Sequence, residues 1–500
     1  MKPPHRSSWN KMKSFWIGVT LCGLLFGILF VIRLGFFNRS FTAQRNHSNM
    51  AISALSERDT WMNIFQKGHK IGYSHTTFIR AEKGYLFKEN INMRINTMGL
   101  VQDINLKTSG KLNPDYTLSA FDFEIGSGRF HFMANGTILK DILSIQTQNV
   151  DSTQRIEIKL KEKIYMVPAL LDAVTASGIK PGDEYSLQVF DPATLGQETV
   201  HIRVVGKEDI LSMGKTKRAT KVLLIFKGIT QTAWMGEQGG VLKEKGILGI
   251  SLERTTRDEA LYGLPVESSQ DLTMAASIPS NLLIDDARTL VRLDVEIGGI
   301  QFDDVDLKGG RQTLNRNVLR IVKESLADLP AVIETNSLLA SEKKYLEPTL
   351  FIQSDHPKIK KLTRQIVSAE TKPLKKVHKL VDWIQDNIEK RPVLSLPDAL
   401  STLQNRMGDC NEHAVLLAAL SRAAGIPAKI EAGLVYLNGR FYYHAWNLLY
   451  LGRWITVDPL FGQIPADVTH IRFSSGSQKQ QLDLMSIIGK IKLIIVDYKQ

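Results

Sequence analysis

The stretch that decides the fold is residues 406–428, which read RMGDCNEHAVLLAALSRAAGIPA. Asp409 and Glu412 have the spacing of a capping box, in which the N-cap residue and the third helical residue each bond the other's backbone amide. The run of alanine, valine and leucine that follows predicts a helix buried on most sides. Gly425 suits the left-handed position after a helix, and the proline two residues later stops any continuation. The stretch therefore predicts a helix with Cys410 in its first turn.

This position has a chemical consequence for the thiol. A thiolate in the first turn of a helix faces unpaired amide hydrogens and the positive end of the helix dipole, so we expect the pKa of Cys410 to be lowered. The alternative interpretation of a lone cysteine is a small buried hydrophobic side chain. Cys22 is the second of only two cysteines in the chain. Neither a disulfide framework nor a thiolate zinc site is therefore expected.

A second stretch, residues 440–459, reads RFYYHAWNLLYLGRWITVDP. Its aromatic and β-branched content predicts two strands of a hairpin that turns near Gly452. Reflecting the register about that turn places Asp458 opposite residues 444–446, within reach of His444. A carboxylate there would fix the imidazole tautomer and stabilise its protonated form. With the cysteine at the helix start, the hairpin completes a triad of nucleophile, base and orienting carboxylate.

Four motifs in these stretches resemble the bacterial transglutaminase-like superfamily. They are GDC at 408–410, RAAGIPA at 422–428, HAW at 444–446 and WITVDP at 454–459. The resemblance covers about residues 350–475 and implies a papain-like fold, with Cys410 as nucleophile, His444 as general base and acid, and Asp458 as orienting residue. Members of the family include amide crosslinkers, cysteine peptidases and deamidating or deglycosylating hydrolases. Residues 447–449 depart from the family's pattern after the histidine, which bears on substrate preference more than on the triad.

Other side chains near these motifs are candidates for supporting roles. His413 is three residues after the cysteine on the same helix, where packing or support is expected rather than proton transfer. The backbone amide of the cysteine itself is the first candidate to stabilise an oxyanion. Gln404, six residues upstream, could add a side-chain amide, and Asn405 and Trp383 are alternatives to it. His470 either lines the site or closes the domain.

The N-terminal segment predicts a membrane anchor. Residues 15–32 run without a charge, and eighteen helical residues span about 27 Å, close to the roughly 30 Å hydrocarbon core. Residues 34–37 extend the apolar stretch, so we place the transmembrane anchor at 15–37 and a cytoplasmic tail at 1–14. A cleaved signal peptide is the alternative, although no small-residue cleavage site follows. The bulk of the chain is then expected in the periplasm, held at the inner membrane by one helix.

The rest of the chain divides by its hydrophobic period. Residues 38–56 are polar and predict a linker. From Trp61 to about Ala260 the dominant period is two, which predicts a large, curved antiparallel sheet, and residues 291–306 add further strand pattern, so we expect a β-rich region at 57–330. Such a sheet could hold a lipid or peptide, or serve as a scaffold. A helical period from Pro357 marks the transglutaminase-like domain at 345–480, which a C-terminal extension follows at 481–500. The expected fold class is α+β.

Charge and composition restrict the function. Lysine and arginine number 63 against 51 aspartate and glutamate residues, a net charge of +12. These cations are scattered, without a basic stripe interleaved with aromatic residues, so no nucleic-acid partner is expected. No cofactor and no metal are expected either.

The function expected is that of a membrane-anchored thiol enzyme acting on amide or peptide bonds of envelope proteins or peptides through a thioester acyl-enzyme. Hydrolysis is slightly favoured over transfer to an amine. The alternative is a non-catalytic envelope binding or assembly protein whose β-rich domain holds a partner or lipid. The sequence leaves open the substrate, the oligomeric state and any dependence on calcium.

Overall fold

The computed structural model describes residues 57–500 and the backbone of Phe36–Phe37, excluding residues 98, 129, 150–151, 194, 227–228, 238, 264–269, 303–304, 334–337, 394–396 and 477–486. The predicted tail 1–14 and linker 38–56 lie outside the described residues, as does 15–35 of the predicted anchor. Phe36–Phe37, the end of that anchor, instead form strand β1, which pairs antiparallel with β14 (Ile229–Met235). Within the part of the chain that the structure describes, no helix combines the length and the apolar character that a bilayer crossing requires.

A 16-stranded sheet forms the N-terminal part. Its strands are β1, β2 (Arg58–Gln66), β3 (His69–Ala81), β4 (Gly84–Thr97), β5 (Leu100–Leu112), β6 (Leu118–Ser127), β7 (Phe130–Leu139), β8 (Ile142–Asn149), β9 (Ser152–Lys159), β10 (Tyr165–Met166), β11 (Glu184–Asp191), β12 (Gly196–Ser212), β13 (Lys215–Phe226), β14, β15 (Val241–Lys245) and β16 (Ile250–Thr255). The order is β10-β11-β12-β13-β14-β15-β16-β2-β3-β4-β5-β6-β7-β8-β9, with β1 beside β14. Apart from the parallel β10–β11 pair, neighbours run antiparallel, as the sequence predicts.

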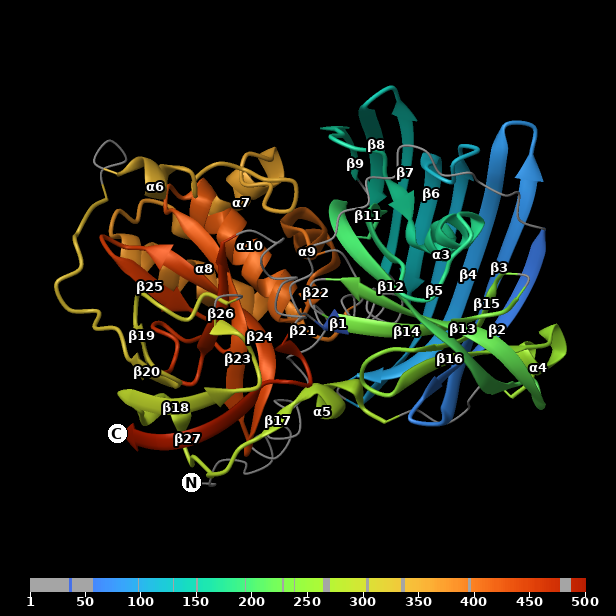
Figure 1. Cartoon of the computed structure of the whole chain (residues 1–500). Helices are drawn as coiled ribbons and strands as arrows, with labels where there is room; N and C mark the ends of the chain where they lie inside the picture. The colour runs from blue at the N-terminus through green and yellow to red at the C-terminus, as the bar shows by residue number, and fades with distance from the viewer. Residues whose placement is uncertain are drawn as a thin grey trace, which may run out of the picture.

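Alternation of apolar and polar side chains gives this sheet one buried face and one face toward solvent. On β4, Phe87, Ile91 and Ile95 are buried, whereas Lys88 between them is exposed. Figure 1 shows that the sheet is strongly curled. Helix α3 (Val167–Ala176) packs against β4, β10 and β11, and most of its residues are buried.

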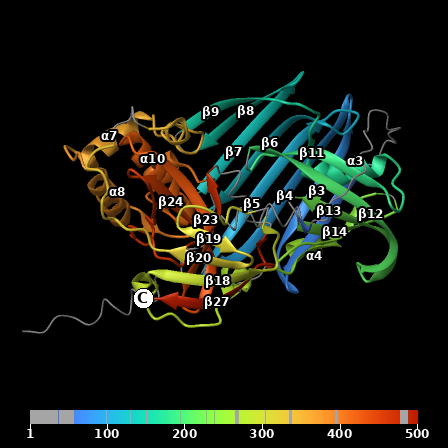
Figure 2. The same ribbon diagram turned by 60° about the vertical axis from the view of Figure 1, so that its left-hand side comes forward.

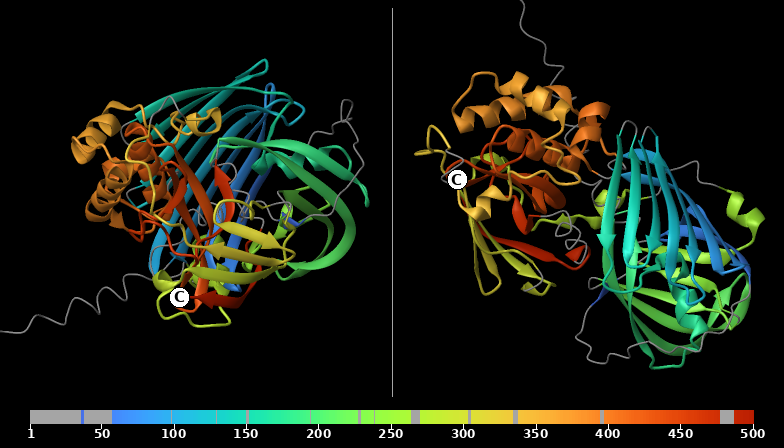
Figure 3. Two further views of the ribbon diagram at one scale, coloured as in Figure 1. Left: turned by 90° about the vertical axis from the view of Figure 1, so that its left-hand side faces the viewer. Right: turned by 90° about the horizontal axis from the view of Figure 1, so that it is seen from above.

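The C-terminal part contains a five-stranded sheet covered by helices. Its strands are β17 (Ile278–Pro279), β23 (Ala428–Leu437), β24 (Arg440–Tyr450), β25 (Trp454–Val457) and β26 (Ile471–Gly476), in the order β17-β24-β23-β26 with β25 on β24. The helices are α7 (Pro357–Val367), α8 (Pro373–Asn387), α9 (Ala399–Asn405) and α10 (Cys410–Ala423). In Figure 3 these orange helices gather on one side of the sheet. The shorter elements are α4 (Arg257–Leu261), α5 (Leu272–Ala276), η2 (Ala287–Thr289), α6 (Ala340–Lys343) and the parallel pair β21 (Glu389–Lys390) and β22 (Met407–Gly408).

A third sheet joins segments that are far apart in the chain. Strands β18 (Arg292–Gly298), β20 (Val318–Val322), β19 (Gln312–Asn315) and β27 (Lys492–Lys499) pair in the order β19-β20-β18-β27 (Figure 2). Within residues 278–322 of the predicted β-rich region 57–330, β17 pairs with β24 and β18 pairs with β27. Residues 492–499 of the expected extension 481–500 thus complete a sheet. The alternation within β18 predicts a strand correctly, but it carries no information about which distant strand completes the pairing.

Helix α10 is the centre of the C-terminal core. It packs against α7, α8 and α9 on one side and against β23 and β24 on the other. The capping box forms as the spacing predicts: the amide of Asp409 donates to Glu412 Oε2 at 3.0 Å, and Asp409 accepts from the amide of Asn411. Gly425 follows the helix with φ of 80°. Because both ends are determined by local bonds, the first turn of α10 is held firmly.

Candidate active site

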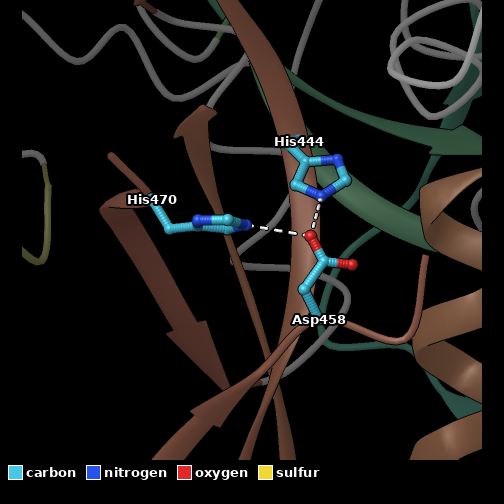
Figure 4. A group of neighbouring side chains, drawn as sticks. All are labelled: His444, Asp458 and His470. Atoms are coloured by element: carbon cyan, nitrogen blue, oxygen red, sulfur yellow. Dashed lines mark hydrogen bonds and ion pairs between the residues drawn. The ribbon is translucent and has the colours of Figure 1, made fainter. Parts of the chain in front are cut away.

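The β24–β25 hairpin brings His444 and Asp458 together. The strands pair from Tyr450 with Trp454 to Asn447 with Val457, so Asp458 follows directly after β25, at the position opposite residue 446. His444 Nε2 lies 2.7 Å from Asp458 Oδ2, and both side chains are fully buried (Figure 4). The register thus places the two side chains in contact, and position 446 lies within the predicted range of 444–446.

Asp458 is held by four hydrogen bonds. Its Oδ1 accepts the backbone amides of Leu460 and Phe461 at 2.7 and 2.9 Å. Its Oδ2 accepts from His444 and from His470, the latter at 2.9 Å. Burial raises the pKa of Asp458, but the two imidazoles more than offset it and hold the pKa well below its usual range. The group is therefore a carboxylate at neutral pH.

His470 is the residue whose importance sequence reasoning missed. Beyond its bond to Asp458, its Nδ1 lies 3.3 Å from Asp467 Oδ1 and 3.2 Å from the Asp467 carbonyl. Burial lowers the pKa of His470, but the carboxylates of Asp467 and Asp458 outweigh it and raise the pKa to about 9. The available signal was an acidic residue three positions before the histidine in a segment that follows the triad carboxylate.

Cys410 lies beside the backbone of the histidine strand. Its sulfur accepts the backbone amide of Ala445, the residue after His444, and Asn411 Nδ2 lies 3.7 Å from it. His444 Nδ1, the ring nitrogen not used by Asp458, is buried and has no hydrogen-bond partner among the described residues. No hydrogen bond joins Cys410 Sγ to that nitrogen in the described structure. Such contacts are often loose before the reacting complex forms.

The protonation state expected for Cys410 requires correction. Cys410 is only 3% exposed. Burial raises its pKa, the nearby carboxylate of Asp409 raises it further, the Ala445 amide acts in the opposite direction, and Glu412 again raises it. The net pKa lies well above its usual value, not below it as the helix start alone suggested. The resting sulfur is therefore a protonated thiol that needs a base.

Two of the predicted supporting residues have distinct surroundings. His413 Nδ1 lies 2.7 Å from the Asp409 carbonyl, and burial lowers the pKa of His413 to about 4, so this ring is neutral. Gln404 lies near the end of α9, and its Nε2 is a buried donor that finds no partner in the described part of the chain. A buried, unused amide is available to an oxygen that develops negative charge.

The other two candidates have no demonstrated link to the triad. The Arg406 guanidinium lies 4.8 Å from the ring centroid of Trp383, so the two side chains form a cation–π contact. Asn405 is the last residue of α9. For neither side chain does the described structure give a hydrogen bond to the triad.

Trp446 and Asn447, which follow His444 on β24, make structural hydrogen bonds to neighbouring elements. Trp446 is fully buried, and its Nε1 donates to Glu431 Oε2 at 2.9 Å. Asn447 Nδ2 donates to the Ala414 carbonyl at 2.9 Å, which ties β24 to α10. The departure from the family pattern at 447 therefore has a structural role in joining the two elements that carry the histidine and the cysteine.

His444, Asp458 and His470 also offer three potential metal-ligand atoms within 4.8 Å of one another. The two imidazole nitrogens, however, already converge on one oxygen of Asp458, whose second oxygen is occupied by two amides. We interpret the group as a hydrogen-bonded network, because every oxygen that could bind a cation is already used.

Residues 360–459 match the family model of the transglutaminase-like superfamily. This range lies within the region 350–475 where the motifs were found, and it contains all three residues of the predicted triad. The chain thus carries a transglutaminase-like domain. A comparison with curated proteins gave no match.

Solved structures show partial similarity. A putative cysteine protease from Cytophaga hutchinsonii is 19% identical over 40% of this chain and 83% of that chain, with a TM-score of 0.29. A β-barrel-like protein with a domain of unknown function from Brucella abortus is 11% identical over 41% of this chain and 98% of that chain, with a TM-score of 0.32. A putative protease from Parabacteroides distasonis is 10% identical over 76% of this chain and 67% of that chain, with a TM-score of 0.18.

Proposed function

We propose that the transglutaminase-like domain at 360–459 makes this chain a thiol enzyme that attacks amide or peptide carbonyls. The observation that carries the proposal is the buried His444–Asp458 pair, which leaves Nδ1 of the ring unused beside the strand that holds the Cys410 sulfur. This is the arrangement that a nucleophile, its base and an orienting carboxylate need.

The proposed reaction has two halves. His444 Nδ1 takes the proton of Cys410 as the sulfur–carbon bond forms, and the Cys410 amide with Gln404 Nε2 stabilises the oxyanion. His444 then gives that proton to the departing amine, the carbon–nitrogen bond breaks, and a thioester remains. A water molecule, deprotonated by the same ring, attacks the thioester and releases a carboxylic acid and the free thiol.

We propose hydrolysis rather than transfer to a lysine amine as the main outcome, with envelope proteins or peptides as substrates. We also propose that a single helix within residues 15–35 anchors the chain in the inner membrane, with the folded parts in the periplasm. The apolar run there supports the anchor, and supplying an amine acceptor in the assay separates hydrolysis from transfer.

An acylation experiment tests the enzyme. With Cys22→Ser in place, Cys410 is the only thiol in the chain. This protein is mixed with p-nitrophenyl acetate, quenched in acid and digested, and the acetyl thioester at Cys410 is quantified by mass spectrometry. His444→Ala is expected to slow acylation by about 10²–10⁴-fold, the usual contribution of a positioned base.

A matched control separates this effect from general damage. His378 is an exposed histidine on α8, so His378→Ala should acylate like the parent. If the folded parent forms no thioester, or if His444→Ala forms it equally fast, the enzyme proposal fails and the binding or assembly alternative is favoured. If the parent passes, acyl-enzyme capture from an envelope extract identifies the natural acyl group.

A further inference from the structure

We infer that His470 is a positioning residue for the proposed triad: it is a buried cation that clamps Asp458 and opposes a second positive charge on His444. The inference rests on the proposed function and deepens it. It concerns a residue that neither the sequence motifs nor the family match at 360–459 includes.

The geometry requires His470 to carry two protons. Its Nε2 lies 2.9 Å from Asp458 Oδ2, and its Nδ1 lies 3.2–3.3 Å from the carbonyl and carboxylate oxygens of Asp467. Ionised carboxylates and carbonyls only accept hydrogen bonds, so both ring nitrogens must donate. The raised pKa of His470 agrees with this.

Asp467 is itself held in place. Its Oδ1 accepts the backbone amide and the hydroxyl of Thr469, and its Oδ2 accepts Gln463 Nε2 at 2.9 Å. The imidazolium thus lies between two fixed carboxylates, Asp458 and Asp467, in a region closed to solvent. These contacts hold the His470 ring in one orientation.

The clamp fixes the tautomer of the catalytic base. Because His470 and two backbone amides occupy the other bonding positions of Asp458, the carboxylate cannot rotate away from His444 Nε2. His444 therefore keeps its proton on Nε2 and presents the lone pair of Nδ1 for the thiol proton.

The charge of His470 acts on the same step. The ring centroids of His470 and His444 are 5.6 Å apart. At this distance the positive charge of His470 repels a second positive charge on His444. The proton on His444 after the thiol attack is then given up more readily to a departing amine, which is a poor leaving group without it. Several charged and titratable groups surround the two rings. They are Asp458 and Asp467 after β25, Cys410, His413, Asp409 and Glu412 at the start of α10, Lys390 on β21, the Glu431–Arg472 pair between β23 and β26, and Arg311, which donates to the His470 carbonyl at 3.0 Å and pairs with Glu324.

Variants of two residues test the charge and the clamp separately. In His470→Gln the amide can still donate to Asp458 but the cation is gone, whereas in His470→Ala both are lost. Asp467→Asn retains an acceptor for the ring but removes the charge that stabilises the cation. Tyr443→Phe is the matched control, because alternate residues of a strand point to opposite faces and this side chain lies next to His444 in sequence.

The readout is the pH dependence of single-turnover acylation by p-nitrophenyl acetate in the Cys22→Ser protein. The acidic limb of this profile in His470→Gln is expected to move to higher pH by about two units, because a unit charge 5.6 Å from the His444 ring is worth about that much at an effective dielectric constant of about 20. In Asp467→Asn the acidic limb should move in the same direction by a smaller amount. In His470→Ala the acylation rate at the plateau should fall as well, whereas the profile of Tyr443→Phe should match that of the parent.

A second readout does not need turnover. In histidine labelled with nitrogen-15, both His470 nitrogens should show the imidazolium signal at neutral pH, and Asp467→Asn should lower the pH at which His470 titrates. A neutral His470 at pH 7, or an unmoved acidic limb in His470→Gln, overturns the inference even if the parent acylates. If the parent does not acylate, the enzyme proposal fails alone, and the nitrogen signals of His444 in parent and His470→Gln still decide whether the cation acts on it.

Discussion

The buried cation makes the stability of the C-terminal part depend on pH in a defined direction. Folding raises the pKa of His470 to about 9, from about 6.5 in an unfolded chain. The stabilisation from its proton is therefore complete below about pH 6.5 and is lost as the pH rises through 9. A difference of about 2.5 pH units corresponds to about 3 kcal/mol. Between pH 6.5 and 10 the free energy of unfolding of the parent should therefore fall by about 3 kcal/mol relative to that of His470→Gln.

Hydrogen exchange measured by mass spectrometry suits a chain of several parts, because it reports the opening free energy of each segment. The segment to follow is β24, after correction for intrinsic exchange at each pH, and β4 of the large sheet serves as the internal control. The free-energy difference between parent and His470→Gln on β24 should shrink by about 3 kcal/mol over the range. A difference that stays constant from pH 6.5 to 10 would refute the assignment of two protons to His470.

Three further substitutions have defined outcomes. Tyr443→Phe removes a buried hydroxyl that has no partner among the described residues, so thermal melting should show a gain of about 1 kcal/mol, and a lower melting temperature would contradict the reasoning. Gly408→Ala would place a methyl group 2.2 Å from Glu412 Cβ; it should cost about 1–3 kcal/mol and slow acylation, whereas Gly298→Ala, whose nearest contact is at 3.9 Å, should do neither. Asn447→Ala loses the bond to α10 and should speed hydrogen exchange in that helix by an amount equivalent to about 1–3 kcal/mol, so unchanged exchange would remove its structural role.

The parts of the site that local rules determine were predictable. The capping box around Cys410 and the turn at Gly452 each depend on residues a few positions apart, and both formed as expected. The hairpin register then placed Asp458 beside His444 without any knowledge of the rest of the fold. The spacing of nearby residues therefore predicted the helix start at Cys410 and the contact between His444 and Asp458.

What depends on burial or on distant pairing was not predictable. The helix start predicted a lowered pKa for Cys410, but the surrounding core and the Asp409 carboxylate reverse the direction. The role of His470 required knowing that Asp458 and Asp467 would approach it from both sides. The pairing of β18 with β27 joins segments about 200 residues apart, for which the pattern of either strand gives no partner.

The junction between β16 and β2 has a consequence for folding kinetics. Strands β2–β9 and β11–β16 each form a meander in which neighbours in the sheet are also neighbours in sequence. The two meanders meet where Leu252 of β16 pairs with Ile64 of β2, a residue 188 positions earlier in the chain. Closing so long a loop is slow compared with forming hairpins. Two half-sheets with exposed edges should therefore exist before the junction closes, and newly made chains would be most prone to associate with one another during that interval.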